Sequence, residues 1–389
     1  MIKRVILIIL DGLGIGNAKD EKKYGDEGAN TLLHTIEKTG ILLPNLNKMG
    51  LMNLIYNTKD ETNGFYGILE EVSPGKDTTT GHWELMGLVL KKPFPTYPDG
   101  FPDFIIKEFE RKIGREVLWN KPASGTEIIE KLGEEHIKTE KPIVYTSADS
   151  VFQIAAHINV IPLEELYKMC EIAREILKGE HAVARVIARP FAGEPGKFYR
   201  TSDRKDFSLE PPDDTLLDIL IKNGYKTLGI GKIYDIFAGR GLTESIHIEN
   251  NTENMATLLK ATIERDEFSL IFTNLVDFDM NYGHRRDVWG FANALLEFDG
   301  FLGNYLRWLK DDDLLIITAD HGNDPTFSKH TDHTRERVPI FGFGKKVKSN
   351  NFIKLNKFSD LGATVAEIFG LKTINGKSFL NKIITDKNK

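Results

Sequence analysis

Carboxylates and imidazoles are concentrated in two stretches of this sequence, VDFDMNYGHRRD and TADHGNDPTFSKHTDHTRERVP. Four of the ten histidines lie between positions 284 and 333, among several aspartates. Burying so many charged groups together would be costly unless cations compensated them. The pattern therefore indicates a site for divalent metal ions. The residues concerned are Asp277, Asp279, His284, Asp320, His321, Asp324, His330, Asp332 and His333.

The number and type of plausible ligands favour two metal ions. A single aspartate or histidine is more often a cap or a local hydrogen-bond partner, but their joint occurrence favours a metal site. Carboxylate and imidazole donors without thiolate suit Mn²⁺ or Zn²⁺ better than Mg²⁺. Two adjacent ions are a recurrent arrangement for phosphoryl transfer. The six candidate ligands are Asp11, Asp279, His284, Asp320, His321 and His333.

Three consecutive threonines, Thr78, Thr79 and Thr80, lie within PGKDTTTGHWELMG. A hydroxyl group attacks phosphorus at neutral pH only when a base or a metal ion activates it. If GHWELMG begins a helix, the threonines lie at its amino end, where free N–H groups favour an anion. The alternative is that one of them merely caps the helix. The residue types alone leave open which threonine is a nucleophile.

Three apolar runs that end in aspartate would position these groups. VILIILD ends at Asp11, SLIFTNLVDFD at Asp279, and LLIITADH at Asp320 and His321. Such runs are typical of strands buried on both faces of a parallel sheet, and helical patterns such as TLLHTIEKT separate them. We predict an α/β fold with a doubly wound, mainly parallel sheet. The aspartates should then converge at the carboxyl ends of the strands.

A chain of 389 residues is long enough for about two domains. The Pro-rich stretches KKPFPTYP and SLEPPDD flank a segment of different texture. We predict a smaller α+β domain, residues 91–210, inserted into a core built from residues 1–90 and 211–389. The two crossings would serve as hinges.

Composition limits the partners and the compartment. A net charge of −6 gives no reason to expect nucleic acid or an anionic membrane, and nothing indicates an oligomeric state. The only cysteine, Cys170, excludes an internal disulfide and lies in a helical pattern, as expected for a buried thiol in a cytoplasmic protein. The apolar run before Asp11 is too short for a membrane span and lacks a signal-peptide cleavage site, so we expect a strand.

Several motifs together resemble phosphopentomutase of the bacterial type, in the alkaline phosphatase superfamily. They are GKDTTTGHWELMG, GKIYDIFAGRG, NLVDFDMNYGHRRD, TADHGNDPT and HTRERVPI, with ADSVFQIAAH and KFYRTSDRKDF in the inserted segment. The metal motifs alone would indicate only the superfamily. The threonine motif and the inserted motifs make the resemblance specific, and it runs nearly from end to end.

The resemblance implies a set of metal ligands and a nucleophile. Thr78 would be the nucleophile, phosphorylated in the working enzyme, and both ions would be Mn²⁺. The loop PTFSKHTDHT is one residue longer than the usual form and adds His330, although TDHTRE follows the family pattern around His333. One ion would be held by Asp279, His284 and His333, and the other by Asp11, Asp320, His321 and Thr78.

The implied reaction interconverts ribose 1-phosphate or 2-deoxyribose 1-phosphate with the 5-phosphate through a pentose bisphosphate. A sugar bisphosphate would prime the enzyme, and the inserted domain would act as a lid that excludes water. In this interpretation Asp149 contacts sugar hydroxyls and basic residues bind the distal phosphate. Those residues are Arg189, Arg200, Arg204 and Lys232, of which Arg200 and Lys232 lie in family-like motifs.

Two other classes of function would use similar residues. A phosphomonoesterase or a cofactor-independent phosphoglycerate mutase would have the same metals, but the latter usually has serine in place of Thr78 and a longer insertion. A metal-binding or sugar-phosphate-sensing protein with a dead site is a non-enzymatic alternative. The presence of every expected ligand argues against that alternative.

Overall fold

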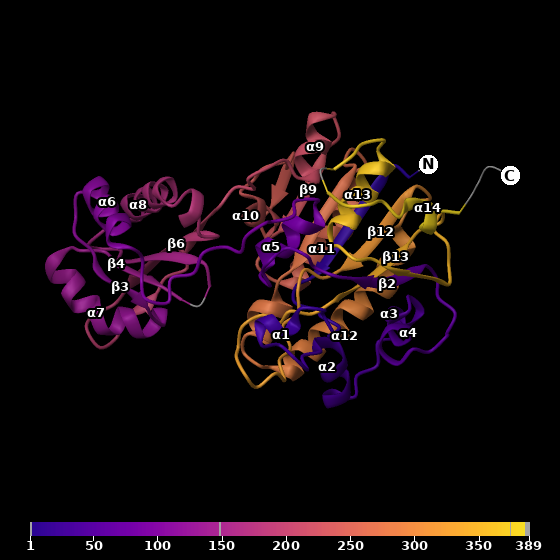
Figure 1. The fold of residues 1–389 in the computed structure, drawn as a ribbon, viewed down its shortest axis with the longest axis horizontal. Helices are drawn as coiled ribbons and strands as arrows, with labels where there is room; N and C mark the ends of the chain where they lie inside the picture. The colour runs from indigo at the N-terminus through magenta and orange to yellow at the C-terminus, as the bar shows by residue number, and fades with distance from the viewer. Residues whose placement is uncertain (1, 148, 374, 386–389) are drawn as a thin grey trace. The chain divides into compact units, whose positions relative to one another are not determined.

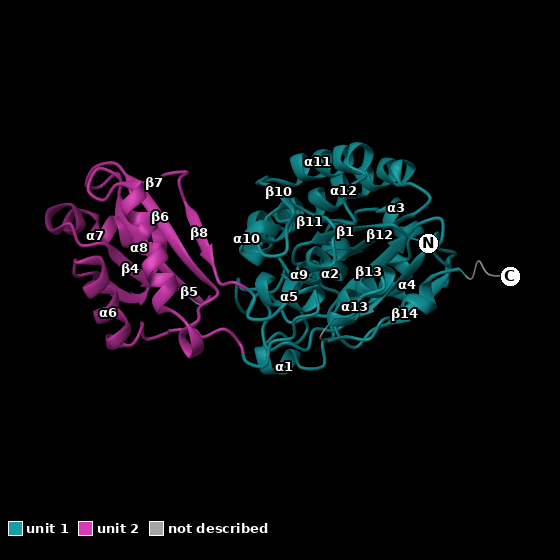
Figure 2. Ribbon diagram, turned by 90° about the horizontal axis from the view of Figure 1, so that it is seen from above, with its two compact units in different colours: residues 1–92, 211–389 teal, residues 93–210 magenta. Residues whose placement is uncertain are grey.

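The computed structural model describes residues 2–147, 149–373 and 375–385 (Figure 1). The chain divides into two compact units (Figure 2). Unit 1 comprises residues 1–92 and 211–389, and unit 2 comprises residues 93–210. The chain therefore leaves unit 1 once and returns to it, so unit 1 is built from two separate segments.

Unit 1 is built on an eight-stranded sheet with the order β10-β9-β11-β1-β12-β13-β2-β14. β1 lies between β11 and β12 and runs parallel to both, whereas β13 runs antiparallel to its two neighbours. The sheet is therefore mixed but mainly parallel. Its strands are β1 (Arg4–Leu10), β2 (Phe65–Leu69), β9 (Thr227–Gly231), β10 (Glu244–Ile246), β11 (Leu270–Leu275), β12 (Asp313–Thr318), β13 (Val338–Phe343) and β14 (Asn351–Lys354).

Helices cover both faces of this sheet, with α11 and α12 on one side and α5 and α13 on the other (Figure 2). Because both faces are covered, every residue of β1, β11 and β12 is buried, which explains their continuous apolar sequences. The helical elements are α1 (Glu21–Tyr24), α2 (Thr31–Thr39), α3 (Pro44–Lys48), α4 (Leu51–Tyr56), α5 (Thr78–Leu85), α9 (Leu216–Lys222), α10 (Ile233–Phe237), α11 (Asn251–Glu264), the π-helix η2 (Phe278–Gly283), α12 (Val288–Tyr305), η3 (Leu306–Trp308), α13 (Ser359–Ile368) and α14 (Leu380–Ile383).

Unit 2 has its own six-stranded sheet, with the order β3-β4-β5-β6-β7 and with β8 also paired to β6. One face packs against α6 and α8 and the other against α7, so unit 2 has two small cores. Its elements are α6 (Asp103–Ile113), β3 (Leu118–Pro122), α7 (Gly125–Thr139), β4 (Ile143–Thr146), β5 (Val151–His157), α8 (Leu163–Ile176), η1 (Gly179–His181), β6 (Arg185–Ala192), β7 (Tyr199–Arg200) and β8 (Lys205–Ser208).

The predicted fold class is confirmed, because a mainly parallel α/β sheet is accompanied by a smaller α+β unit. The N-terminal apolar run forms the central strand β1, as expected from its sequence. Cys170 is buried on α8, and burial raises the pKa of its thiol well above the ordinary value, which fits a structural role. Among the helices of the described residues, none has both the length and the hydropathy that crossing a membrane requires.

Candidate metal centre

In the unit 1 sheet, the three apolar runs that end in aspartate form the neighbouring strands β11, β1 and β12, and their carboxyl ends lie side by side. Leu10, the last residue of β1, lies beside Leu275 of β11, and Ile9 lies beside Thr318 of β12. The residues that follow these strands are therefore neighbours in space, although they come from distant parts of the sequence. This arrangement supplies the frame for two groups of possible metal ligands.

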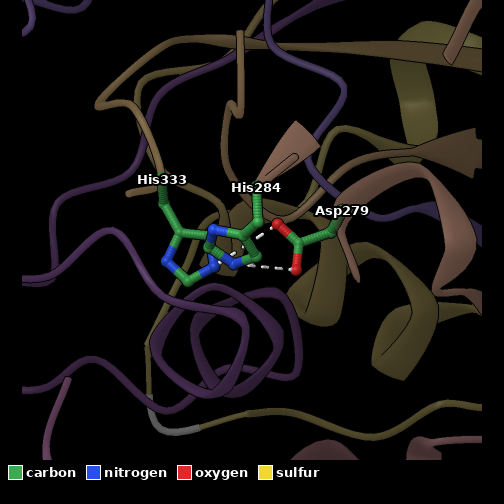
Figure 3. Close-up of side chains that lie close together, drawn as sticks. All are labelled: Asp279, His284 and His333. Atoms are coloured by element: carbon green, nitrogen blue, oxygen red, sulfur yellow. Dashed lines mark ion pairs between the residues drawn. The ribbon is translucent and has the colours of Figure 1, made fainter. Parts of the chain in front are cut away.

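The first group consists of Asp279, His284 and His333, whose imidazole rings face the carboxylate (Figure 3). His284 Nε2 lies 3.3 Å from Asp279 Oδ2, and His333 Nε2 lies 3.4 Å from Asp279 Oδ1. The π-helix η2 contains Asp279, and His284 follows its last residue as the C-cap, so one short segment presents both side chains. His284 Nδ1 is 2.7 Å from the Thr331 carbonyl, which orients its other nitrogen towards the carboxylate.

The second group consists of Asp11, Asp279 and His321, with Asp320 beside them. His321 Nε2 lies 3.3 Å from both Asp11 Oδ1 and Asp320 Oδ2. The His321 and His333 rings are 4.2 Å apart between centroids, so the two groups adjoin. The structure thus brings together all six candidate ligands from the sequence, Asp320 lying beside the second group.

The donors of this centre fit divalent cations. Asp11 Oδ1 and Asp320 Oδ2 are buried and accept no well-aligned hydrogen bond from any described residue. Buried carboxylate oxygens in this condition are costly, and a bound cation would satisfy them. Oxygen and imidazole donors without sulfur match Mn²⁺ or Zn²⁺.

Thr78 is the threonine that faces the centre. Its Oγ1 lies 3.2 Å from His321 Nε2. Helix α5 begins at Thr78, three residues before Gly81, so the three threonines form the amino end of the helix. The reason is that Asp77, in extended conformation, caps the helix and accepts a hydrogen bond from the Thr80 N–H at 3.0 Å. No threonine is therefore needed as the cap.

Two asparagines and one histidine hold the carboxylates from behind. Asn274 donates to Asp11 Oδ2 at 2.8 Å, and Asn323 donates to Asp279 Oδ1 at 2.7 Å. His82 lies on α5, with Nδ1 3.1 Å from Asp320 Oδ2. Such outer partners fix the orientation of ligands.

The electrostatics of the centre favour added positive charge. Burial raises the pKa of Asp11, and the nearby carboxylates of Asp320 and Asp279 raise it further. Burial opposes ionisation of Asp279, but the imidazoles of His333 and His284 together outweigh it and hold the pKa of Asp279 well below its usual range. Burial disfavours the charged form of His321, yet Asp320 and Asp11 raise its pKa well above the ordinary value. Protons should therefore compete with metal ions as the pH falls.

Three further residues of the two motifs, Asp277, Asp324 and His330, have partners outside the two groups. Asp324 binds His34 Nδ1 at 2.6 Å, and Asp277 accepts a hydrogen bond from the Asn251 N–H at 2.7 Å. His330 Nε2 lies 2.7 Å from Asp26 Oδ1. The structure therefore places His333, and not His330, among the candidate metal ligands.

Unit 2 contains a polar cavity of about 250 Å³. Asp149, Arg200 and Arg204 line it together with Arg189, whose Nε donates to Gln153 Oε1 at 3.0 Å. Burial and the nearby Arg204 lower the pKa of Arg189 to about 10, so it stays charged at neutral pH. The fifth predicted substrate residue is in unit 1, where Lys232 precedes α10. Unit 2 thus gathers guanidinium groups suited to an anion.

Sequence comparisons identify the family. The family model of the Metalloenzyme superfamily matches residues 3–373. The phosphopentomutase of Caldanaerobacter subterraneus subsp. tengcongensis is 58% identical over 389 residues, covering 98% of each chain. The chain belongs to the phosphopentomutase family. The phosphopentomutase of Dictyoglomus turgidum is also 58% identical with the same coverage, and that of Carboxydothermus hydrogenoformans is 57% identical over 388 residues, covering 98% of this chain and 100% of the other. The resemblance inferred from the motifs is thereby confirmed.

Several residues that surround these sites escaped the sequence prediction. In unit 2, Arg185 lines the cavity, and its guanidinium lies 3.5 Å from the Asp206 carboxylate. The buried Tyr145 also lines the cavity, beside Arg200. Strand alternation was a usable signal for Arg185, because residues 185, 187 and 189 lie on one face of β6 and all line the cavity. Asn274 and Asn323 stand inside motifs of the phosphopentomutase family, but their residue types alone gave no signal.

Proposed function

We propose that this chain interconverts ribose 1-phosphate or 2-deoxyribose 1-phosphate with the corresponding 5-phosphate. The observation that carries the proposal is the Thr78 hydroxyl, which lies 3.2 Å from His321 Nε2 inside a carboxylate and imidazole centre. Relatives 58% identical over nearly the whole chain are named phosphopentomutases. Together these findings support an isomerase that moves a phosphoryl group between two oxygens of one sugar.

Two Mn²⁺ ions would complete the centre. Bound ions would neutralise the carboxylates, lower the pKa of the Thr78 hydroxyl and stabilise charge on the phosphoryl oxygens. The first ion would be held by Asp279, His284 and His333, and the second by Asp11, Asp320, His321 and Thr78.

The transfer begins from enzyme phosphorylated on Thr78. A hydroxyl oxygen of the sugar monophosphate attacks phosphorus, the bond from phosphorus to Thr78 Oγ1 breaks, and a pentose bisphosphate forms. When the bisphosphate binds in the opposite orientation, Thr78 Oγ1 attacks the other phosphorus, which releases the isomeric monophosphate. The amino end of α5, where Thr78 lies, favours the negative phosphoryl group during both transfers. No inorganic phosphate is released, and a sugar bisphosphate is needed to phosphorylate new enzyme.

The cavity of unit 2 is proposed to bind the phosphate that does not react. Arg189, Arg200 and Arg204 provide fixed guanidinium groups, and Asp149 can accept hydrogen bonds from sugar hydroxyls. Lys232 is proposed as a further cation for this phosphate. The lid role of the inserted domain and a cytoplasmic location, which the single cysteine favours, stay predictions.

Substitution of Thr78 by alanine tests the proposal. Turnover of ribose 1-phosphate should collapse, while metal content changes little because the other ligands remain. Thr79→Ala is a matched control. Among the contacts of the described residues, it is Thr78 and not Thr79 that lies against His321, so the Thr79→Ala enzyme should keep most of its activity.

A second measurement identifies the reaction class. After exposure to a sugar bisphosphate, intact-mass and peptide analysis should find one added phosphoryl group, on Thr78. Stoichiometric release of inorganic phosphate from ribose 1-phosphate, or normal turnover by Thr78→Ala, would overturn the mutase assignment.

A further inference from the structure

A buried carboxylate outside the metal centre connects the two segments that carry Thr78 and His333. Asp26 has no exposed surface. Its oxygens lie 3.2 and 3.3 Å from Lys76 Nζ, two residues before Thr78. The same carboxylate is 2.7 Å from His330 Nε2 and accepts the Arg335 N–H at 2.7 Å. Asp26 therefore binds one group before Thr78 and two groups that flank His333.

The contacts of Asp26 belong to a wider set that fastens the loop of residues 329–335. Lys329 Nζ donates to the carbonyls of Gly25 at 3.1 Å and Glu27 at 3.4 Å. The buried guanidinium of Arg335 donates to the Ser73 carbonyl at 3.0 Å and also binds the Gly75 carbonyl. Residues 25–27, 73–76 and 329–335 thus meet in one place, and Asp26 lies at the junction.

Lys76 extends this connection to a neighbour of the candidate ligand. Its ammonium group lies 3.4 Å from Asp332 Oδ2, and Asp332 Oδ1 accepts the His333 N–H at 2.8 Å. The Lys76 side chain is only 16% exposed, so its charge depends on the carboxylates around it. Loss of the Asp26 charge would leave the Lys76 ammonium with less neighbouring negative charge. It would also weaken the contacts of Asp26 with His330 and Arg335, which hold the loop.

We propose that Asp26 is a positioning residue that holds the segment before Thr78 and the loop carrying His333 at a fixed separation. The proposal rests on the proposed function for the roles of Thr78 and His333. Asp26 is in neither group of candidate metal ligands, so it acts through Lys76 and the loop. Metal affinity and the rate of phosphoryl transfer should therefore depend on a side chain that contacts neither metal nor substrate.

Asp26→Asn tests this proposal, because it keeps the size of the side chain and removes its charge. Titration of the metal-free protein with Mn²⁺ in a calorimeter should show about 10–100-fold weaker binding of one of the two ions, as for the loss of other outer partners of metal ligands. The value of kcat should fall while KM for ribose 5-phosphate changes little. Glu27→Gln is the matched control, because this adjacent carboxylate is 49% exposed and pairs with Lys22 on the surface.

A second pair of variants keeps the test decisive if Asp26→Asn does not fold. Lys76→Gln should weaken the same Mn²⁺ site, and Lys76→Arg should restore most of the affinity because it keeps the charge. In the double variant of Asp26→Asn and Lys76→Gln, the loss of Mn²⁺ affinity should be no larger than the greater of the two losses in the single variants. Wild-type Mn²⁺ affinity and kcat in Lys76→Gln would overturn the proposal, as would fully additive losses. Because Mn²⁺ binding is measured without substrate, this result is separate from failure of the proposed reaction.

Discussion

Removal of divalent cations should destabilise unit 1 strongly. Asp11, Asp279 and Asp320 are buried beside one another, and burial together with the neighbouring carboxylates raises the pKa of Asp11. The candidate ligands come from segments that lie far apart in the sequence, so only the folded chain assembles them. Cations bound to the folded state alone must shift the unfolding equilibrium by mass action.

The size of this effect follows from the free ion concentration. An ion present at a thousand times its dissociation constant stabilises the folded state by about 4 kcal/mol. For a unit of about 270 residues, each kcal/mol shifts Tm by about 2–4 °C, so one ion raises Tm by about 8–16 °C. Two ions held by adjoining groups should give a larger shift than one.

Differential scanning calorimetry in EDTA and in Mn²⁺ measures the effect directly. Asp279→Asn should lose most of the Mn²⁺-dependent shift, because Asp279 belongs to both candidate groups. Asp277→Asn is the matched control, since that carboxylate accepts hydrogen bonds from Asn251 and Asn281 and is in neither group. Equal Tm values in EDTA and Mn²⁺, or an unchanged shift in Asp279→Asn, would refute the two-metal interpretation.

Three further predictions follow from single contacts. Asn323→Ala removes a buried amide that donates to a candidate ligand, so calorimetry should show about 10–100-fold weaker Mn²⁺ binding, and an unchanged affinity would contradict this role. Asp313→Asn breaks the buried pair with Arg4, at 2.7 and 2.8 Å, and urea denaturation should show that the free energy of unfolding falls by about 3–5 kcal/mol; an unchanged value would contradict this role of the pair. Burial lowers the pKa of His136, whose Nε2 accepts the His157 N–H at 2.9 Å. The unfolded state therefore binds the proton at a higher pH than the folded state does. The free energy of unfolding should be full above a pH of about 6.5 and fall below it, with lower amide protection factors in β5, and His136→Gln should remove this pH-dependent loss.

The sheet and the candidate ligands could be predicted because each strand carries its own signal. Continuous apolar runs indicate buried parallel strands, and the carboxyl ends of such strands meet at one edge of a sheet. The position of Asp11, Asp279 and Asp320 follows from those two facts. Asn274 and Asn323 could not be predicted this way, because an amide on a buried strand or loop has many possible partners.

The two loop histidines show a second limit of the sequence. His330 and His333 differ by three positions and both have aspartates nearby, so their residue types and spacing alone do not separate them, and the preference for His333 came from the family resemblance. His330 instead contacts the carboxylate of Asp26, which lies about 300 positions earlier in the chain. The tertiary contact gives the physical reason: one imidazole binds Asp26 and holds the loop, while the other lies among the candidate ligands.

The choice among the three threonines depends on where helix α5 begins. Adjacent residues of a helix point about 100° apart, so only one of three consecutive hydroxyls can face a given group. Asp77 fixes the start of the helix by capping it, and its other oxygen accepts the Thr80 hydroxyl at 2.6 Å. With the start fixed, Thr78 is directed at His321 while Thr80 is committed to the cap. The capping residue Asp77 therefore determines which hydroxyl faces the centre, and this supports Thr78 as the proposed nucleophile, since a helix starting one position later would present a different hydroxyl.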